Sequence, residues 1–270
     1  MNITFIGGGN MASAMIGGLL KQGWTAAALR VVEIDPGARS LLERNFGVKA
    51  FAEIGPGIEG SDCVVLAVKP QQLRGVARAL GKQLASQLVV TIAAGIRCVD
   101  LSRWLGGCQR IVRVMPNTPA LALAGIAGLY AMPPVTAEDR GRVEKILGAV
   151  GLTLWLEREE QMDAITAVSG SGPAYVFYFI EALQQAAAEL GFSAEQSRLL
   201  ARQTFSGAIA LAAQSTEDAA VLRLRVTSKG GTTERALSSM EADRVKAAIV
   251  RAVRAAAERS RELGDEFGRD

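Results

Sequence analysis

The sequence contains no histidine, so it lacks the side chain that most often serves as a general base and as a metal ligand. Cysteine is scarce as well. Cys63, Cys98 and Cys108 are odd in number, and none forms a C-x-x-C pair. We therefore expect reduced thiols in a cytoplasmic protein, without a disulfide framework and without a metal site.

Long apolar runs and blocks of one charge are also missing. No uninterrupted apolar run approaches the roughly 18 residues of a membrane span. The apolar N-terminal stretch contains Ala12-Ser13-Ala14, which looks like a signal-peptidase site, but glycines interrupt it and no basic residues precede it, so we expect no signal peptide. Lys and Arg number 30 against 27 Asp and Glu, a net charge of +3, and nothing indicates nucleic-acid binding.

What the sequence does have is a glycine motif at its start. Ile3, Phe5 and Ile6 form a short apolar run that predicts a buried strand. Gly7-x-Gly9-x-x-Ala12 follows directly, and apolar and small residues then recur at helical spacing. This strand, turn and helix order is the context of a dinucleotide-binding fingerprint, in which glycines let the backbone approach a pyrophosphate. The alternative is a tight strand-to-helix turn without a ligand.

The first half of the chain continues with alternating strands and helices. Apolar runs predict further strands over 29–34, 47–50, 62–68, 88–92 and 111–115. Several of them end in turns rich in Gly, Ala or Pro. In an open α/β sheet, ligands bind beyond the carboxyl ends of the strands, so we expect a Rossmann-type domain over residues 1–157 of the 270.

The second half has the periodicity of helices, and we expect an all-helical domain over 158–270. The predicted helices span 159–168, 173–190, 194–213, 219–224, 233–240 and 244–263. Val245, Ile249 and Val253 form a narrow apolar stripe on the last helix. We expect these Ala-rich helices to pack against a second subunit. A charged helix facing solvent on a monomer is the alternative.

Two loops in this half differ from simple connectors. In 169–175, Pro173 suits the first helical position and Ser171 or Gly172 a cap, so this loop alone favours an ordinary helix start. In 227–234, paired glycines precede Thr232 and Thr233 at another helix start, which favours a carboxylate or phosphate receptor. From the residues alone, we expect a dinucleotide enzyme that acts on a small acid.

Six segments together form a more specific pattern. They are Phe5 to Met11, Ala67 to Pro70, Ala93 to Gly95, Met115 to Pro119, Ser169 to Tyr175 and Ser228 to Thr233. In this order, over nearly the whole chain, they resemble the pyrroline-5-carboxylate reductase family. The resemblance implies an oxidoreductase that reduces 1-pyrroline-5-carboxylate to L-proline with NADPH or NADH, the last step of proline biosynthesis. It also implies a helical domain that interlocks with that of a second copy, in a homodimer or a higher multiple.

The resemblance assigns roles to individual residues as well. It places the cofactor against Gly7, Gly9, Asn10, Met11, Ala12, Val68, Lys69, Pro70, Ala94 and Gly95, with Asn117 near the nicotinamide. On the substrate side it places Glu159 as an acid, and the backbone N–H groups of Gly230, Gly231, Thr232 and Thr233 around the carboxylate. The resemblance also implies that Thr233 directs its hydroxyl at the ring nitrogen.

The sequence departs from the family pattern at three places. Lys229 replaces a common Pro, Arg225 stands where some members have an Asn, and Glu33 and Asp35 stand where many have Ser, Asn or Arg. An acid about 20 residues after the fingerprint accepts hydrogen bonds from the adenosine ribose. Glu33 therefore predicts that NADH is used at least as well as NADPH. The alternative is a solvated loop acid without a ligand contact.

The expected reaction is hydride transfer from the nicotinamide to the imine carbon. Without histidine, a proton from the protein must come from a hydroxyl, a carboxyl, a lysine or water. We favour an imine that arrives already protonated, which leaves Thr233 or Ser171 to orient it. Two rival functions remain. A 3-hydroxyacid-type dehydrogenase needs a lysine acid/base, for which the helical half offers only Lys229 and Lys246. An NAD(P)-binding sensor would not need the receptor at 230–233.

Overall fold

The computed structural model describes residues 1–269, and by its internal contacts the chain divides into two compact units. The sheet unit comprises Met1–Ser171 together with the residues from Ala256 onward, and the helical unit comprises Gly172–Ala255. The domain boundary that the sequence places between residues 157 and 158 stays a prediction.

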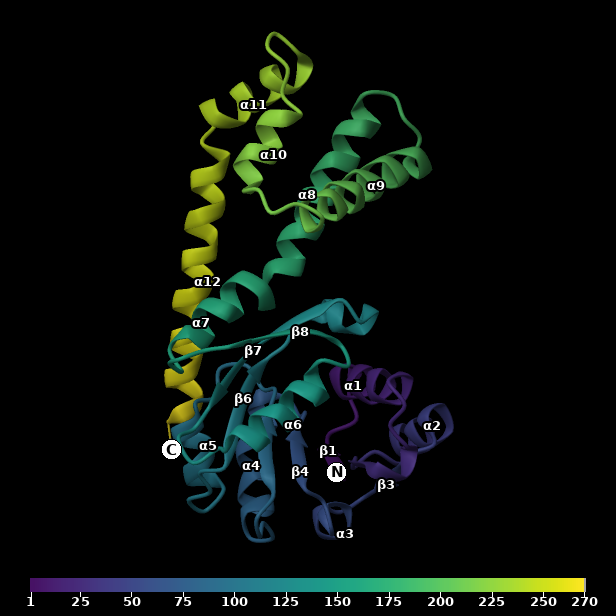
Figure 1. Ribbon diagram of the computed structural model, residues 1–270, viewed down its shortest axis with the longest axis vertical. Coiled ribbons are helices and arrows are strands. Elements are labelled where there is room, and N and C mark those ends of the chain that lie inside the picture. Colours follow the sequence, from purple (N-terminus) through teal and green to yellow (C-terminus); the bar gives the residue numbers. More distant parts are fainter. Residues whose placement is uncertain (270) are drawn as a thin grey trace. The chain divides into compact units, whose positions relative to one another are not determined.

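One sheet organises the sheet unit (Figure 1). Its strands follow the order β3-β2-β1-β4-β5-β6-β7-β8, and all neighbours are parallel except β6 and β7. The expected Rossmann-type architecture is therefore confirmed. The bounds are β1 (Ile3–Ile6), β2 (Leu29–Val32), β3 (Lys49–Phe51), β4 (Cys63–Leu66), β5 (Leu88–Thr91), β6 (Ile111–Met115), β7 (Gly125–Ala131) and β8 (Gly151–Trp155).

The sequence analysis did not predict β7 and β8. β7 carries glycines at both Gly125 and Gly128, where a side chain would collide with the Ala120 backbone or with Ile165. β8 lies at the edge of the sheet and alternates between exposed and half-buried residues. Close backbone approach and edge position both weaken the apolar pattern on which strand prediction depends.

Alternate residues of each central strand pack into separate cores on the two faces of the sheet. On one face Ile3 and Phe5 join Met15 of helix α1 (Asn10–Lys21). On the other face Ile6 joins Leu73 of helix α4 (Pro70–Gly81). Burial of each such side chain stabilises the fold by about 1.5–3 kcal/mol before entropy is counted. Because both faces are covered, β1, β4 and β5 are buried throughout.

Local sequence signals fix the remaining helices of the sheet unit. In α2 (Pro36–Phe46), for example, the Asp35 carboxylate accepts from Ala38 N–H at 2.6 Å, and Gly47 ends the helix at φ +68°. The other elements are η1 (Ala26–Ala28), α3 (Ile54–Ile58), α5 (Cys98–Trp104), η2 (Thr118–Ala122), α6 (Ala137–Leu147), α7 (Gln161–Ile165) and the π-helical turn η3 (Thr166–Gly170).

The helical unit agrees with the expected all-helical half. Its elements are α8 (Gly172–Glu189), α9 (Ala194–Ala213), α10 (Ala219–Arg225), α11 (Thr232–Ala242) and the first part of α12 (Val245–Gly268), whose last residues belong to the sheet unit. The helix expected to start at Pro173 is present, since α8 begins at Gly172 with Pro173 in its first turn. The π turn η3 before it was not predicted.

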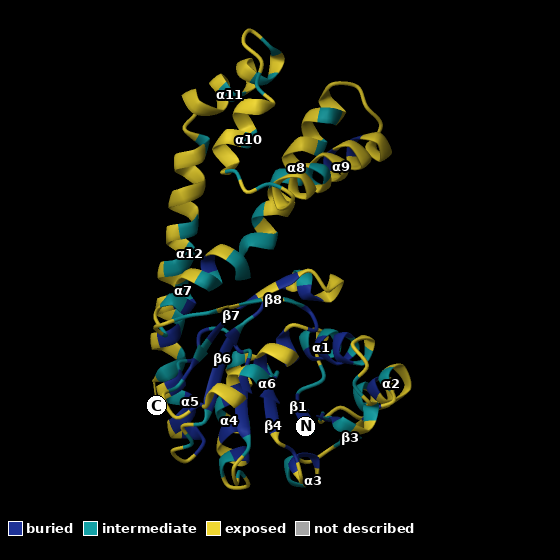
Figure 2. Ribbon diagram, viewed as in Figure 1, coloured by how far each residue is buried: buried dark blue, intermediate teal, exposed yellow. Residues whose placement is uncertain are grey.

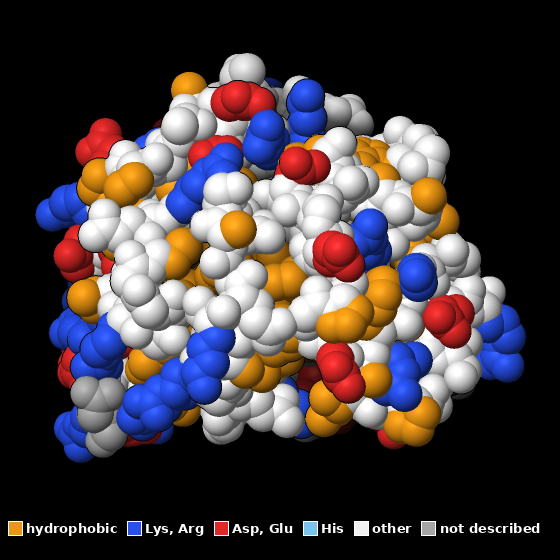
Figure 3. Space-filling model, turned by 90° about the horizontal axis from the view of Figure 1, so that it is seen from below, with side chains coloured by type: hydrophobic (Ala, Val, Ile, Leu, Met, Phe, Trp, Pro, Cys, Tyr) orange, Lys and Arg blue, Asp and Glu red, His pale blue; other side chains and the backbone are white. Residues whose placement is uncertain are grey.

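Burial differs sharply between the two units. In Figure 2 the central strands of the sheet are dark blue, whereas α8 to α11 are mostly yellow. Charged side chains of both signs are interspersed over the face in Figure 3, with hydrophobic side chains between them. Among the residues that the structure describes, no helix combines the length and the apolar character needed to cross a membrane.

Candidate cofactor and substrate site

The glycine motif forms the turn between β1 and α1. Gly7 has φ +99°, and a side chain there would lie 2.8 Å from the carbonyl oxygen of Ala67. Gly9 faces open space, since a Cβ atom added there would have no other atom within 4 Å. α1 begins after Gly9 without a side-chain cap, which leaves its first-turn N–H groups available for an anion.

A cavity of about 350 Å³ opens over this turn. Five residues of the predicted cofactor set line it together: Gly7, Gly9, Glu33, Val68 and Lys69. They come from the ends of β1, β2 and β4, which are neighbours in the sheet. The topology therefore brings the carboxyl ends of these strands to one hollow, as expected for an open α/β sheet.

Glu33 points toward the glycine turn. Its Oε2 accepts from Gly8 N–H at 2.9 Å, and its Oε1 accepts from Asp35 N–H at 3.1 Å. Arg39, one turn into α2, donates from its guanidinium to the carbonyl oxygens of Glu33 at 2.7 Å and Ile34 at 2.9 Å. The carboxylate is thus fixed at the rim of the cavity by two backbone donors.

The other predicted cofactor residues do not line this hollow. Asn10 and Met11 start α1, Ala12 is buried in the core beneath it, and Pro70 starts α4 after Lys69. Ala94 and Gly95 follow β5.

Asn117, predicted to lie near the nicotinamide, is buried. Its Oδ1 accepts from Ile126 N–H at 3.0 Å, and this bond ties the loop after β6 to β7. The Asn117 side chain therefore has a structural partner within the sheet unit.

Ser171 ends the π turn at the boundary of the sheet unit. Its N–H donates to the Thr166 carbonyl at 2.8 Å, and a side chain at Gly170 would lie 2.6 Å from the Met115 methyl group. The turn is therefore packed directly against the end of β6. π turns often occur at functional sites because they displace one residue from the regular helix.

The predicted carboxylate receptor lies in the helical unit, before α11. Gly230 has φ +72°, and its N–H donates to Glu234 Oε2 at 2.6 Å, while Gly231 N–H donates to the Ser228 carbonyl at 3.0 Å. Within the described part of the chain, the N–H groups of Thr232 and Thr233 have no acceptor. The donors available to a ligand are therefore the two threonine amides rather than the glycine amides.

Glu159 belongs to a network inside the sheet unit. Its Oε1 accepts from Arg113 Nη1 at 2.8 Å and from Cys98 N–H at 2.7 Å. The Arg113 side chain is 6% exposed and that of Glu159 is 20% exposed. This predicted substrate residue therefore has two protein partners.

Comparison with known proteins identifies both halves of the chain. Residues 159–263 match the family model described as pyrroline-5-carboxylate reductase dimerisation. Residues 2–95 match the model described as NADP oxidoreductase, coenzyme F420-dependent. The pyrroline-5-carboxylate reductase of Pseudomonas aeruginosa is 45% identical over 98% of both chains. The chain belongs to the pyrroline-5-carboxylate reductase family. The family expected from the six segments is thus confirmed.

Solved structures of this family have the same fold. A pyrroline-5-carboxylate reductase from Coxiella burnetii superposes with a TM-score of 0.92 at 40% identity, covering 97% of this chain and 98% of that one. The Plasmodium falciparum pyrroline carboxylate reductase with NADP bound gives a TM-score of 0.87 at 30% identity, covering 98% of each chain.

Sequence reasoning missed several residues of this reductase fold. The cavity is also lined by Ile34, Ala52, Ile54, Gln72 and Val76. In the sequence, only their position after the end of a predicted strand could have indicated that they line the cavity. Arg225, noted as a departure, donates to Glu217 at 2.6 Å. Lys229 lies in the exposed loop before Gly230.

Proposed function

We propose that this chain reduces 1-pyrroline-5-carboxylate to L-proline with a reduced nicotinamide cofactor. The observation that carries the proposal is family membership over nearly the whole chain, at 45% identity to the Pseudomonas aeruginosa reductase. A 3-hydroxyacid-type dehydrogenase or an NAD(P) sensor would not account for a match that includes both halves.

The residues at the glycine turn fit a dinucleotide. Gly9 presents bare backbone to open space, and α1 offers uncapped N–H groups next to a cavity of about 350 Å³. Gly7, Gly9 and the start of α1 would hold the pyrophosphate, with Val68 and Lys69 beside it. The bound cofactor supplies the hydride for the imine carbon.

The substrate carboxylate fits the start of α11. The N–H groups of Thr232 and Thr233 point from a helix N-terminus, where the helix dipole favours a negative charge. Held there, the substrate is oriented with its ring nitrogen toward the Thr233 hydroxyl. Orientation of this kind lowers the barrier by restricting the reactants beforehand.

The proton for the imine comes from solution in this proposal. The chain has no histidine, and the hydroxyls of Thr233 and Ser171 are too weakly acidic to protonate an imine readily. The imine therefore enters protonated, and Thr233 or Ser171 orients it by accepting a hydrogen bond.

We also propose that NADH serves at least as well as NADPH. The Glu33 carboxylate, held by the N–H groups of Gly8 and Asp35, lies where it can accept from the free 2′-hydroxyl of NADH. The same charge repels a 2′-phosphate. Arg39, which could reach such a phosphate, is engaged by two carbonyl oxygens.

The chain carries the family's dimerisation domain, and we propose that it works as at least a homodimer in the cytoplasm. Its three cysteines, all within the described residues, are free thiols, which fits a reducing compartment.

A spectrophotometric assay tests the proposed function. Pyrroline-5-carboxylate should cause oxidation of NADH and of NADPH, with proline as the product. A panel of 3-hydroxy acids with the oxidised cofactors should give no turnover. Turnover of that panel without reduction of pyrroline-5-carboxylate would assign the chain to the rival dehydrogenase class. Binding of NADH without turnover of either substrate would favour the sensor.

A further inference from the structure

The loop between β5 and α5 contains the predicted cofactor residues Ala94 and Gly95. Gly95 has φ +73°, and a side chain there would lie 3.1 Å from the Phe267 ring and 3.3 Å from Leu263. The end of α12 thus covers one side of the loop. On that side the loop cannot move without displacing a packed aromatic ring.

Glu159 holds the other end of this loop. Cys98 is the first residue of α5, so its N–H has no acceptor within the helix. Glu159 Oε1 accepts from it at 2.7 Å, although the two residues are 61 positions apart in the sequence. The carboxylate therefore fixes where the loop ends and α5 begins.

Arg113 fixes Glu159 in turn. It projects from the middle of β6, the strand next to β5, and its guanidinium donates to the same Oε1 at 2.8 Å. The Arg113 side chain is 6% exposed, so it needs its counter-charge. One carboxylate oxygen thus joins β6 to the end of the cofactor loop.

We infer that Glu159 is a positioning residue for the Ala94-Gly95 cofactor loop and does not bind the substrate. The inference rests on the proposed function for the position of the cofactor. Loss of the Glu159 carboxylate then leaves Cys98 N–H without its acceptor, so the loop becomes more mobile and the cofactor binds more weakly. The substrate receptor at Thr232 and Thr233 is unchanged.

Two variants and a control test the inference. Glu159→Ala removes the acceptor, Glu159→Gln keeps an acceptor oxygen for Cys98 N–H, and Glu160→Gln alters the exposed neighbouring acid. The readouts are the NADH dissociation constant from nicotinamide fluorescence, and the KM of each substrate. For Glu159→Ala we expect NADH to bind about tenfold more weakly, with the KM of pyrroline-5-carboxylate within about twofold of wild type. Glu159→Gln keeps an acceptor for Cys98 N–H but leaves Arg113 without its counter-charge, so it should restore part of the NADH affinity at a lower stability. Glu160→Gln should match wild type.

The opposite pattern would overturn the inference. A tenfold rise in the KM of pyrroline-5-carboxylate with unchanged NADH affinity, in either Glu159 variant, would make Glu159 a substrate ligand. If Glu159→Ala does not fold, Glu159→Gln still decides through the comparison of the two readouts. A positioning role weakens NADH binding more than it raises the KM of pyrroline-5-carboxylate, and a substrate ligand does the reverse. Failure of the proposed function is a separate result. In that case wild type does not reduce pyrroline-5-carboxylate, and the NADH dissociation constants still test the loop.

Discussion

At the scale of single residues, the proposed use of NADH depends on Glu33. Its carboxylate lines the cavity and accepts from two backbone N–H groups. A side chain at the neighbouring Gly8 would lie 2.4 Å from Leu42 Cδ1, so the Leu42 side chain would have to move. A direct hydrogen bond thus holds the Glu33 carboxylate against the glycine turn.

Glu33→Ser should shift the preference toward NADPH about tenfold, near 1.4 kcal/mol, because a partly exposed carboxylate is screened by water. The measurement is kcat/KM for NADH and for NADPH in wild type and variant. Glu59→Ser, an exposed acid that does not line the cavity, is the control and should leave the ratio unchanged. A wild-type enzyme that strongly prefers NADPH would contradict the argument.

Thr233, in the first turn of α11, is the second residue on which the proposed chemistry depends. Thr233→Ala should lower kcat by about tenfold to a thousandfold, because the hydroxyl orients an imine that is already protonated. Thr233→Ser keeps a hydroxyl and should recover most of the rate. Single-turnover rates would show the effect directly. A loss beyond about a million-fold would mean that Thr233 is indispensable to the chemical step.

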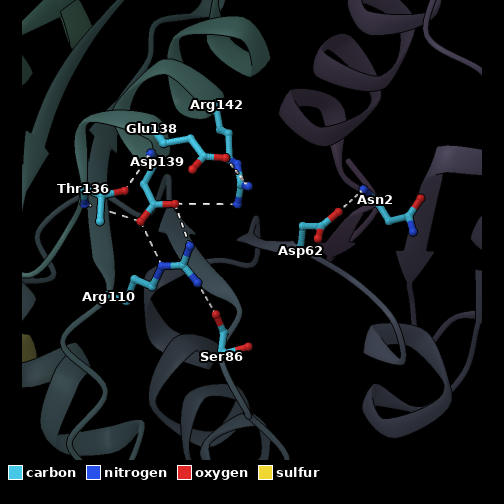
Figure 4. Close-up of polar contacts among 8 residues, drawn as sticks. All are labelled: Asn2, Asp62, Ser86, Arg110, Thr136, Glu138, Asp139 and Arg142. Atoms are coloured by element: carbon cyan, nitrogen blue, oxygen red, sulfur yellow. Dashed lines mark hydrogen bonds and ion pairs between the residues drawn. The ribbon is translucent and has the colours of Figure 1, made fainter.

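At the scale of elements, the start of α6 is fixed by a charged cluster (Figure 4). Asp139 accepts from Arg110 Nε at 2.8 Å and from Arg110 Nη2 at 2.6 Å, and it closes a capping box with Thr136. Arg110 also donates to the Ser86 carbonyl, so one guanidinium joins the start of β6 to α6 and to the loop before β5. The paired guanidinium lowers the pKa of the Asp139 carboxyl.

This lowered pKa predicts the pH dependence of stability. The stabilisation is present above the pKa of an unfolded Asp, about 3.9, and is lost as the pH falls through the lower folded value. Asp139→Asn should therefore cost about 2 kcal/mol at pH 7, and the difference from wild type should shrink below about pH 4. Urea unfolding across this pH range measures it. Glu138→Gln, at an exposed pair with Arg142, should change stability by less than about 0.5 kcal/mol. An Asp139→Asn difference that does not vary with pH would contradict the assignment.

At the scale of the whole molecule, the helical unit has almost no buried core of its own. From Gly172 to Ala255, all of which the structure describes, Ser197 and Ala201 alone are buried. An open apolar groove of about 340 Å³ runs between α8 and α12, lined by Tyr178, Phe179, Ile249 and others. Exposed apolar surface on this scale marks an interaction site. Together with the dimerisation domain of the family, it favours a second copy as the partner.

Light scattering at micromolar concentration should therefore give at least twice the mass of one chain. Ile249→Asp, which places a charge in the groove, should shift the protein toward the monomer and lower its thermal midpoint. Lys246→Asp, on the same helix but outside the groove lining, is the matched control and should leave the mass unchanged. A wild-type mass of one chain would refute the dimer.

The sequence by itself determined the elements whose signals are local. The glycine turn at Gly7, the cap and stop of α2 and the bounds of α9 all follow from neighbouring residues, because backbone freedom, capping and periodicity act over a few positions. The family itself followed from short segments in the right order, since each encodes a local conformation.

Only the tertiary structure decided what distant segments do to one another. It shows that β7 and β8 belong to the sheet and that a π turn lies between α7 and α8. It also shows the hydrogen bond between Glu159 and Cys98, which are 61 positions apart. From the sequence, Glu159 could be assigned to the substrate, because the residues next to a carboxylate do not indicate which distant group it will bind. Its partners depend on which strands lie side by side, and that order is set by the packing of both faces of the sheet.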